Sequence, residues 1–375
     1  MLAKARRGKF AIDTTCPKPD QECVAVSTMP NGIAEVTAAW MSDVTGWSVD
    51  ELTATEIGEG IGMMSAVYRA TLTGSNCPPT AIVKLTALDP ANGFTAQILS
   101  MYKREAIFFN DLASQSPIRV PQSYYAAVSD DGAQVAIVME DIGANRPCDQ
   151  VAGMSIADAE QTVDALARWH AQWWGKVSGL ADSGAAVPLG SPIYPAVVPG
   201  LSAEGWDKIA ASPSCHIPEV LLAIGPKYGD AVPRLLTQLD TAPNTLLHGD
   251  YRGDNIFFAD NGSPVLLDFQ IIGTGSGAYD LAYFITQSLT ESDASAHEGR
   301  LFDRWKDGLI AGGVNAADLA GMWEDYRSAA LFCLCYPLIA SRGMDLDNPR
   351  SIQLLDTMLS RMARAVDELN LAELL

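Results

Sequence analysis

Two carboxylates and one carboxamide stand in the sequence at a spacing that suits phosphoryl transfer. Asp250 closes the tripeptide His248-Gly249-Asp250. Asn255 comes five residues later, and Asp268 follows eighteen residues after Asp250. In this reaction one carboxylate accepts the proton of the attacking hydroxyl, while a second carboxylate and an amide oxygen hold Mg²⁺ against the phosphates. The sequence therefore contains the groups that phosphoryl transfer needs.

A β-hairpin is predicted to bring these groups together. Residues 256–258 and 265–267 form its strands, and Asn261-Gly262 between them suits the positive φ angles of a tight turn. The second strand returns Asp268 towards the loop that carries the other two groups. The alternative is a surface hairpin with polar turn residues.

A glycine-rich stretch lies between two predicted strands, over residues 55–57 and 66–70. Gly58, Gly60 and Gly62 would let backbone N–H groups approach phosphates without interference from a Cβ atom. The order strand, glycine loop, strand differs from the strand, loop, helix order of dinucleotide-binding folds, which argues against a Rossmann site. A flexible hairpin is the alternative for this stretch.

Lys84 lies inside a predicted apolar strand, over residues 81–85. Such a lysine either reaches water at a sheet edge or points into a cleft at an anion. Glu105, twenty-one residues later, falls on the apolar face of a predicted helix. We expect Glu105 to pair with Lys84 and hold its ammonium towards the α- and β-phosphates. A solvated helix charge is the alternative for Glu105.

The composition indicates a folded protein with room for two lobes. The chain has 375 residues, 48% of them hydrophobic and 19% charged. No apolar run approaches the ~20 residues of a transmembrane helix, and the basic amino terminus lacks the apolar centre of a signal peptide. A cytoplasmic location is therefore expected. The seven cysteines are odd in number and include no Cys-x-x-Cys pair, which argues against a disulfide framework or a zinc site.

The net charge indicates which partners the protein can bind. The chain has 25 Lys and Arg residues and 45 Asp and Glu residues, so its formal charge is −20. Such a chain repels nucleic acid and anionic membranes, so neither is expected as a partner. It can bind ATP only with local cations, which Mg²⁺ and a few placed Lys or Arg side chains must supply. The sequence does not indicate an oligomeric state.

The second half of the chain is predicted to be mainly helical. An amphipathic helix over residues 156–173 carries His170, which we interpret as a structural histidine. Asp280, at the start of a later helix, is placed to brace the loop around Asp250 through hydrogen bonds to the loop backbone, and a plain helix-start carboxylate is the alternative. Residues 176–200 are predicted to form a long loop, and residues 270–277 a mobile glycine segment.

These motifs resemble the aminoglycoside phosphotransferase and choline kinase superfamily, which shares the protein-kinase-like fold. Gly249 and Gln270 stand where protein kinases have Arg and Gly, and both differences suit this branch. The nearest resemblance is to the ecdysteroid-kinase-like group and its bacterial relatives. The resemblance covers roughly residues 33–285. The sequence segments that carry it are IVKL, REAIFF, VMED, LLHGDYRGDN and LLDFQ.

The resemblance implies an α+β, bilobal fold. A small β-sheet N-lobe with one main helix would span residues 1–141, and a larger, mostly helical C-lobe residues 142–375. Backbone groups around Met139, Glu140 and Ile142 would contact the adenine edge where the lobes join.

The resemblance also implies a role for each residue of the site. Asp250 would be the catalytic base, and Asn255 and Asp268 would bind Mg²⁺. Lys84, oriented by Glu105, would hold the α- and β-phosphates of ATP. Arg252 stands where protein kinases have a catalytic-loop lysine, so it would touch the γ-phosphate.

The expected activity is that of an ATP-dependent small-molecule kinase, a phosphotransferase with an alcohol group as acceptor. Aromatic residues in the helical half permit a bulky apolar acceptor such as a sterol or a hydroxy acid. An aminoglycoside- or choline-like acceptor stays open. Two other functions also stay open: a nucleotide-binding regulator without kinase activity, and an enzyme that transfers AMP.

Overall fold

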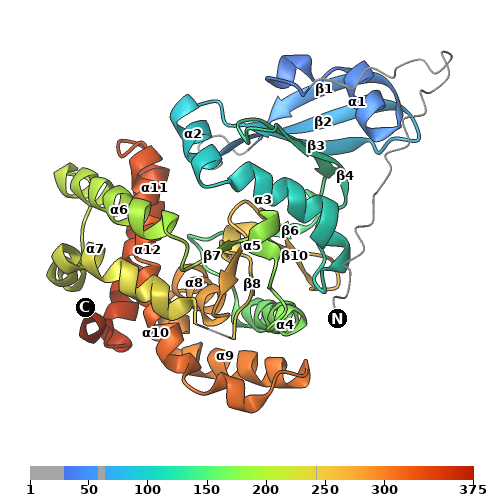
Figure 1. Ribbon diagram of the computed structural model, residues 1–375. Coiled ribbons are helices and arrows are strands. Elements are labelled where there is room, and N and C mark those ends of the chain that lie inside the picture. The colour runs from blue at the N-terminus through green and yellow to red at the C-terminus, as the bar shows by residue number, and fades with distance from the viewer. Residues whose placement is uncertain (1–28, 58–63, 242) are drawn as a thin grey trace, which may run out of the picture.

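The computed structural model describes residues 29–57, 64–241 and 243–375 (Figure 1). A β-sheet-rich N-terminal part stands on a larger helical C-terminal part, which confirms the predicted α+β class. Gly58, Gly60 and Gly62 lie outside the described residues.

The N-terminal part is built on a five-stranded antiparallel sheet. The strand order is β1-β2-β3-β5-β4. Its strands are β1 (Ser48–Glu56), β2 (Ser65–Ser75), β3 (Thr80–Thr86), β4 (Ser123–Val128) and β5 (Val135–Glu140).

The two faces of this sheet pack against different partners, because successive side chains of a strand point to opposite faces. Val83 and Leu85 of β3 join a core with Trp40 of helix α1 (Ala38–Thr45), which follows a short 3-10 turn (Ile33–Glu35). Ile82 joins the other core, which includes Tyr102 and extends into the C-terminal part. Lys84 alternates with Val83 and Leu85, so it faces the C-terminal part.

Two helices connect β3 with β4. Helix α3 (Met101–Ile107) continues into a π turn (Phe108–Leu112) and a 3-10 turn (Ala113–Gln115), and lies between the sheet and the C-terminal part (Figure 1). Helix α2 (Pro90–Ile98) was not predicted, because its large apolar residues Phe94 and Ile98 are exposed and give no amphipathic stripe. Its start has a local signal, since Asp89 caps the helix and Pro90 opens it.

Among its described residues, the C-terminal part packs nine helices and short 3-10 turns around one core. That core includes the fully buried Trp169, Trp305 and Tyr326. No helix among the described residues is long and apolar enough to cross a membrane. The helices are α4 (Ile156–Trp173), α5 (Leu180–Ser183), α6 (Ile193–Ala211), α7 (Glu219–Leu239), α8 (Ala278–Ser288), α9 (Glu291–Ala311), α10 (Met322–Phe332), α11 (Cys335–Gly343) and α12 (Pro349–Glu368). The 3-10 turns are Gly253–Asn255, Ala316–Leu319 and Leu371–Leu374.

Two small sheets lie where the two parts meet. One has the order β10-β9-β6 and the other β7-β11-β8. The predicted hairpin is present as β9 and β10, although only Gly262 of its turn has a positive φ, of 79°. The strands are β6 (Arg146–Pro147), β7 (Val187–Pro188), β8 (Thr245–Leu247), β9 (Ile256–Phe258), β10 (Pro264–Leu266) and β11 (Gly273–Gly275).

The loop predicted over residues 176–200 is wrong in part. This stretch contains α5, β7 and the beginning of α6. Pro199 and Gly200, which suggested a loop, lie within α6. A Cβ at Gly205 of α6 would lie 1.8 Å from the carbonyl oxygen of Leu338 in α11, and Pro199 is accommodated within the helix.

The glycine segment over residues 270–277 is also ordered, because β11 runs between β7 and β8. A Cβ at Gly273 would lie 2.8 Å from the carbonyl oxygen of Val187, and one at Gly275 would lie 2.7 Å from Leu189. These glycines permit close strand contacts instead of mobility.

Candidate active site

The loop that carries Asp250 is held by the buried carboxylate of Asp280, as predicted. Asp280 Oδ2 accepts a hydrogen bond from the backbone N–H of His248 at 2.8 Å, and Oδ1 accepts one from Gly249 at 2.9 Å. Gly249 has a φ of 88°, and a Cβ there would lie 2.2 Å from the carbonyl oxygen of Ile271. Only glycine fits this position, because an L side chain would be strained and would clash.

His170 supports Asp280, which agrees with its interpretation as a structural histidine. It is fully buried, and its Nδ1 accepts a hydrogen bond from Trp305 Nε1 at 3.1 Å. The indole can only donate, so the proton of the imidazole is on Nε2. Nε2 lies 3.1 Å from Asp280 Oδ2 and donates to it.

Asp250 and Asn255 lie together at the end of this loop. Asn255 Nδ2 donates to Asp250 Oδ2 at 2.7 Å and to the Asp250 carbonyl at 2.9 Å. Because both bonds need a donor, they fix the orientation of the amide. Asn255 Oδ1 is therefore turned away from Asp250. Burial raises the pKa of the Tyr283 hydroxyl well above its usual value, and the nearby Asp250 carboxylate raises it further.

Lys84 joins the N-terminal sheet to this site. Its ammonium lies 2.7 Å from Glu105 Oε1 and 3.2 Å from Asp268 Oδ1. The Lys84–Glu105 ion pair is therefore present as predicted. Lys84 and Glu105 are 5% and 1% exposed, whereas the Asp268 side chain is 37% exposed, so Asp268 is the member of the group that is open to a ligand.

The charges in this group are unevenly matched, because two carboxylates share one ammonium. Burial alone would lower the pKa of Lys84, but Asp268 and Glu105 raise it above its usual value. Burial alone would raise the pKa of Asp268, but Lys84 lowers it below its usual value. Burial raises the pKa of Glu105 to about 7, although Lys84 opposes that change. Because the pKa of Glu105 is raised and that of Asp268 is lowered, Glu105 is the carboxylate that takes up a proton first as the pH falls.

Asn255 and Asp268 fit a divalent metal whose remaining ligands come from phosphates and water. Asn255 Oδ1 and Asp268 Oδ2 accept no hydrogen bond from any described residue. Asp268 has a φ of 62°, a conformation that L residues seldom adopt and that often marks functional sites. Within the described parts of the chain no cluster of three or more His, Cys, Asp or Glu side chains is suited to a metal. Mg²⁺ commonly takes one or two protein carboxylates and completes its octahedron with phosphates and water.

The strand register shows which side chains share a face of the sheet with Lys84. Ile82 pairs with Met139, and Val67 pairs with Lys84, so all four face the C-terminal part. Ile142 follows β5 and is buried. The side chain of Glu140 is occupied by contacts with Arg119 and with the backbone N–H of Gln122.

Arg252 is more tightly held than the sequence suggested. Its Nε donates to Asp250 Oδ1 at 3.1 Å, and its Nη1 donates to Gln150 Oε1 at 2.6 Å and to Asp254 Oδ2 at 2.8 Å. Burial alone would lower the pKa of Arg252, but Asp250 and Asp254 raise it above its usual value. Its Nη2 has no hydrogen-bond partner among the described residues, so one edge of the guanidinium is available to a ligand.

Sequence reasoning missed three residues of the site, namely Gln150, Asp254 and Tyr283. Asp254 had a local signal, since it stands two residues after Arg252 in the same loop. Gln150 and Tyr283 had none, because they come from distant parts of the chain.

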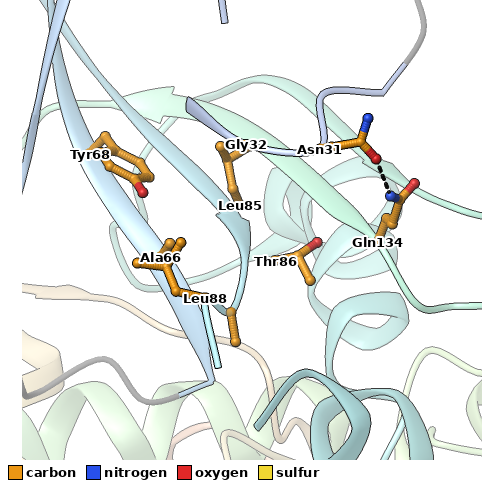
Figure 2. Close-up of a pocket in the computed structure, with 9 residues that line it drawn as sticks. Asn31, Gly32, Ala66, Tyr68, Leu85, Thr86, Leu88 and Gln134 are labelled. Carbon is orange, nitrogen blue, oxygen red and sulfur yellow. Dashed lines mark hydrogen bonds between the residues drawn. The ribbon is translucent and has the colours of Figure 1, made fainter. Parts of the chain in front are cut away.

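A separate hollow of about 170 Å³ lies on the other face of the N-terminal sheet. Figure 2 shows Tyr68, Leu85 and Leu88 around it, beside the hydrogen-bonded pair Asn31 and Gln134. Leu85 alternates with Lys84, so this hollow opens away from the cleft. It contributes no group to the site.

Comparisons with known proteins agree with this geometry. A sequence model described as the phosphotransferase enzyme family matches residues 65–332. A homoserine kinase from Granulibacter bethesdensis is 30% identical over 105 residues, which are 28% of this chain and only a third (33%) of that protein.

Solved structures share the fold at low sequence identity. A choline kinase from Cryptosporidium parvum Iowa II has a TM-score of 0.55 at 10% identity, over 90% of this chain and 94% of that one. An amicoumacin kinase in complex with AMP-PNP, Ca²⁺ and Ami has a TM-score of 0.50 at 15% identity, over 83% and 87% of the two chains. The family match begins at β2 and covers strands β2 to β5 of the five-stranded sheet and most of the helical part, and the chain belongs to the phosphotransferase enzyme family.

Proposed function

We propose that this protein is an ATP-dependent kinase that transfers the γ-phosphate to a hydroxyl group of a small molecule. The observation that carries the proposal is the contact of Lys84 with Asp268, whose neighbour Leu267 hydrogen-bonds the loop of Asp250 and Asn255. Lys84 of the sheet contacts Asp268 at 3.2 Å, and Asn255 contacts Asp250 at 2.7 Å. A cation for phosphates, oxygen ligands for a metal and a carboxylate for a proton are the groups that phosphoryl transfer needs.

In this proposal Lys84, oriented by Glu105, binds the α- and β-phosphates. Asn255 and Asp268 hold Mg²⁺, which when bound neutralises charge on the phosphates. The two free oxygens, Asn255 Oδ1 and Asp268 Oδ2, support that assignment. Adenine would lie under Val67, Ile82 and Met139 and would contact the backbone of residues 140–142. Gly58, Gly60 and Gly62 would cover the phosphates.

Asp250 has the role of proton acceptor. Its carboxylate takes the proton of the acceptor hydroxyl as the hydroxyl oxygen forms a bond to the γ-phosphorus. The bond between that phosphorus and the bridging oxygen breaks, and its electron pair leaves with ADP. The hydrogen bonds from Arg252 and Asn255 fix the carboxylate in one orientation, which supports this role because a general base must be held at a defined place.

Four further statements stay predictions. They are the boundary between lobes near residue 141, the ecdysteroid-kinase-like resemblance, the cytoplasmic location, and the acceptor itself. The cleft suits a small molecule with a hydroxyl group. A sterol, a hydroxy acid, an aminoglycoside-like compound and a choline-like compound remain the candidate classes.

The proposal is tested by screening hydroxylated acceptors with ATP and Mg²⁺ while ADP release and product mass are measured. We expect a product that carries one added phosphate. Asp250→Asn should lower turnover by ~10²–10⁴, as expected for loss of a general base. Asp260→Asn, in the exposed turn of the same hairpin, is the matched control and should leave turnover unchanged.

Two results would replace the proposal with another function. A product that carries AMP would identify a nucleotidyl transferase. Binding of ATP with no transfer to any acceptor, and equal behaviour of wild type and Asp250→Asn, would identify a nucleotide-binding regulator.

A further inference from the structure

A buried arginine of the last long helix reaches the loop beside the active site. Arg361 of α12 is 3% exposed. Its Nη1 donates to the carbonyl oxygens of Gln150 at 2.7 Å and Gln287 at 2.6 Å, and its Nη2 donates to that of Val151 at 3.3 Å. No carboxylate in the described parts of the chain forms an ion pair with it. The partners of this cation are therefore backbone carbonyls, which it ties together.

Gln150, the residue whose carbonyl Arg361 holds, belongs to the shell around Arg252. It is 1% exposed. Its Oε1 accepts the hydrogen bond from Arg252 Nη1 at 2.6 Å, and its backbone N–H donates to Asp254 Oδ1 at 3.1 Å. Asp254 Oδ2 accepts a second bond from Arg252 Nη1 at 2.8 Å. Gln150, Arg252 and Asp254 thus form a closed ring of hydrogen bonds.

This ring determines where the remaining edge of Arg252 points. A guanidinium is planar and rigid, so fixing two of its nitrogens fixes the third. Nε is fixed by Asp250, and Nη1 is fixed by Gln150 and Asp254. Nη2 is left without a protein partner in the described part of the chain, next to the carboxylate that accepts the proton in the proposed reaction. An anionic oxygen of the transferring phosphoryl group is the ligand chemistry that this edge fits.

We propose that Arg361 and Gln150 are positioning residues for Arg252, so that helix α12 sets the direction of the cation beside Asp250. The inference rests on the proposed kinase function. It concerns a helix that begins after residue 332, where the family match ends. It also gives a reason for a buried arginine that lacks a carboxylate partner. Burying such a cation is costly, and removing it would leave three carbonyls without their donor.

Arg364 supplies the matched control, because it lies one turn further along α12 and is also largely buried. It pairs with Glu298 at 2.6 Å and has no contact with the ring around Arg252. Arg364→Met and Arg361→Met remove the same charge from the same helix. Both should lower stability, but only Arg361→Met should affect the active site.

The first test measures kcat and KM with ATP and Mg²⁺, using water or any acceptor found by screening. Gln150→Leu and Arg361→Met should lower kcat about tenfold to a hundredfold, the range expected when a catalytic group is misplaced. KM for ATP should stay within about twofold, since the groups assigned to ATP are untouched. Arg361→Lys should recover part of the loss, because an ammonium can still donate to these carbonyls. In a variant that already carries Arg252→Ala, Arg361→Met should lower kcat no further.

Two results would overturn the inference. One is an equal loss of kcat from Arg361→Met with and without Arg252, and the other is an equal loss from Arg364→Met. The proposed function is judged separately. Full activity of Asp250→Asn would remove that function, whereas an inactive Asp250→Asn together with fully active Gln150→Leu and Arg361→Met would remove this inference alone.

A second test needs no activity. The Arg252 Nε–H signal, assigned through its loss in Arg252→Lys, is followed by NMR for hydrogen exchange. Protection in wild type and Arg364→Met, with faster exchange in Gln150→Leu and Arg361→Met, is the expected result. An unprotected signal in wild type, or equal protection in all variants, would show that the ring does not hold Arg252.

Discussion

The most specific consequence of the structure concerns Asp280, which holds the catalytic loop from inside the core. Asp280→Asn keeps the shape of the side chain but replaces one oxygen by a donor. In wild type, Oδ2 accepts from His248 N–H and His170 Nε2, and Oδ1 accepts from Gly249 N–H. The asparagine oxygen can serve the two donors at Oδ2. Its amide group then faces the Gly249 N–H, and two donors are left in contact.

The magnitude follows from these three bonds. An orphaned, buried N–H costs about 1–3 kcal/mol, and each of the two remaining bonds loses about 1 kcal/mol when its acceptor is no longer charged. Asp280 is fully buried, so water cannot compensate. We expect Asp280→Asn to lower the free energy of unfolding by about 3–5 kcal/mol.

The assay is urea-induced unfolding, followed by tryptophan fluorescence and far-UV circular dichroism. Asp164→Asn is the control, because Asp164 forms a partly exposed ion pair with Arg304. This substitution should lower the free energy of unfolding by less than about 1 kcal/mol. The reasoning would be refuted if Asp280→Asn were no less stable than Asp164→Asn.

Three other predictions follow from single positions. Because burial raises the pKa of Glu105 to about 7, the folded state holds a proton that the unfolded state releases, and this group lowers the free energy of unfolding as pH rises from about 4.5 to about 7. Urea unfolding at several pH values should show that Glu105→Gln removes a slope of at most about 1.4 kcal/mol per pH unit, and parallel profiles would contradict it. Gly249→Ala introduces a strained φ and a clash with Ile271, so it should lower the free energy of unfolding by at least about 2 kcal/mol in the same assay. An unchanged free energy of unfolding would show that the loop can relax. The buried thiols of Cys333 and Cys335 should not react with a thiol reagent until the protein unfolds, so rapid labelling in the native state would be inconsistent with their burial.

The loop and hairpin that carry Asp250, Asn255 and Asp268 could be predicted because they are local. The segment from Asp250 to Asp268 forms a loop and hairpin whose residues are close along the chain. Lys84 and Glu105 lie on a strand and a helix whose periodicity could be read directly. The brace by Asp280 was predictable because helix α8 follows the hairpin closely.

The remaining features depend on contacts between distant segments. Arg252 is separated from Gln150 by 102 residues, and Gln150 from Arg361 by 211 residues. No local pattern marks such partners. Part of the loop over residues 176–200 was mispredicted because Pro199 and Gly200, residue types that usually interrupt a helix, lie inside α6.

The central claim is that Asn255 and Asp268 hold a metal against the phosphates of ATP beside Lys84. Isothermal titration calorimetry with ATP, in Mg²⁺ and in excess EDTA, tests it on wild type and on the isosteric Asp268→Asn. We expect wild type to bind ATP only with Mg²⁺ and Asp268→Asn to bind at least about tenfold more weakly, a loss of about 1.4 kcal/mol. Wild type that binds no ATP at millimolar concentration, or binds it equally well without Mg²⁺ or without the Asp268 carboxylate, would contradict the claim.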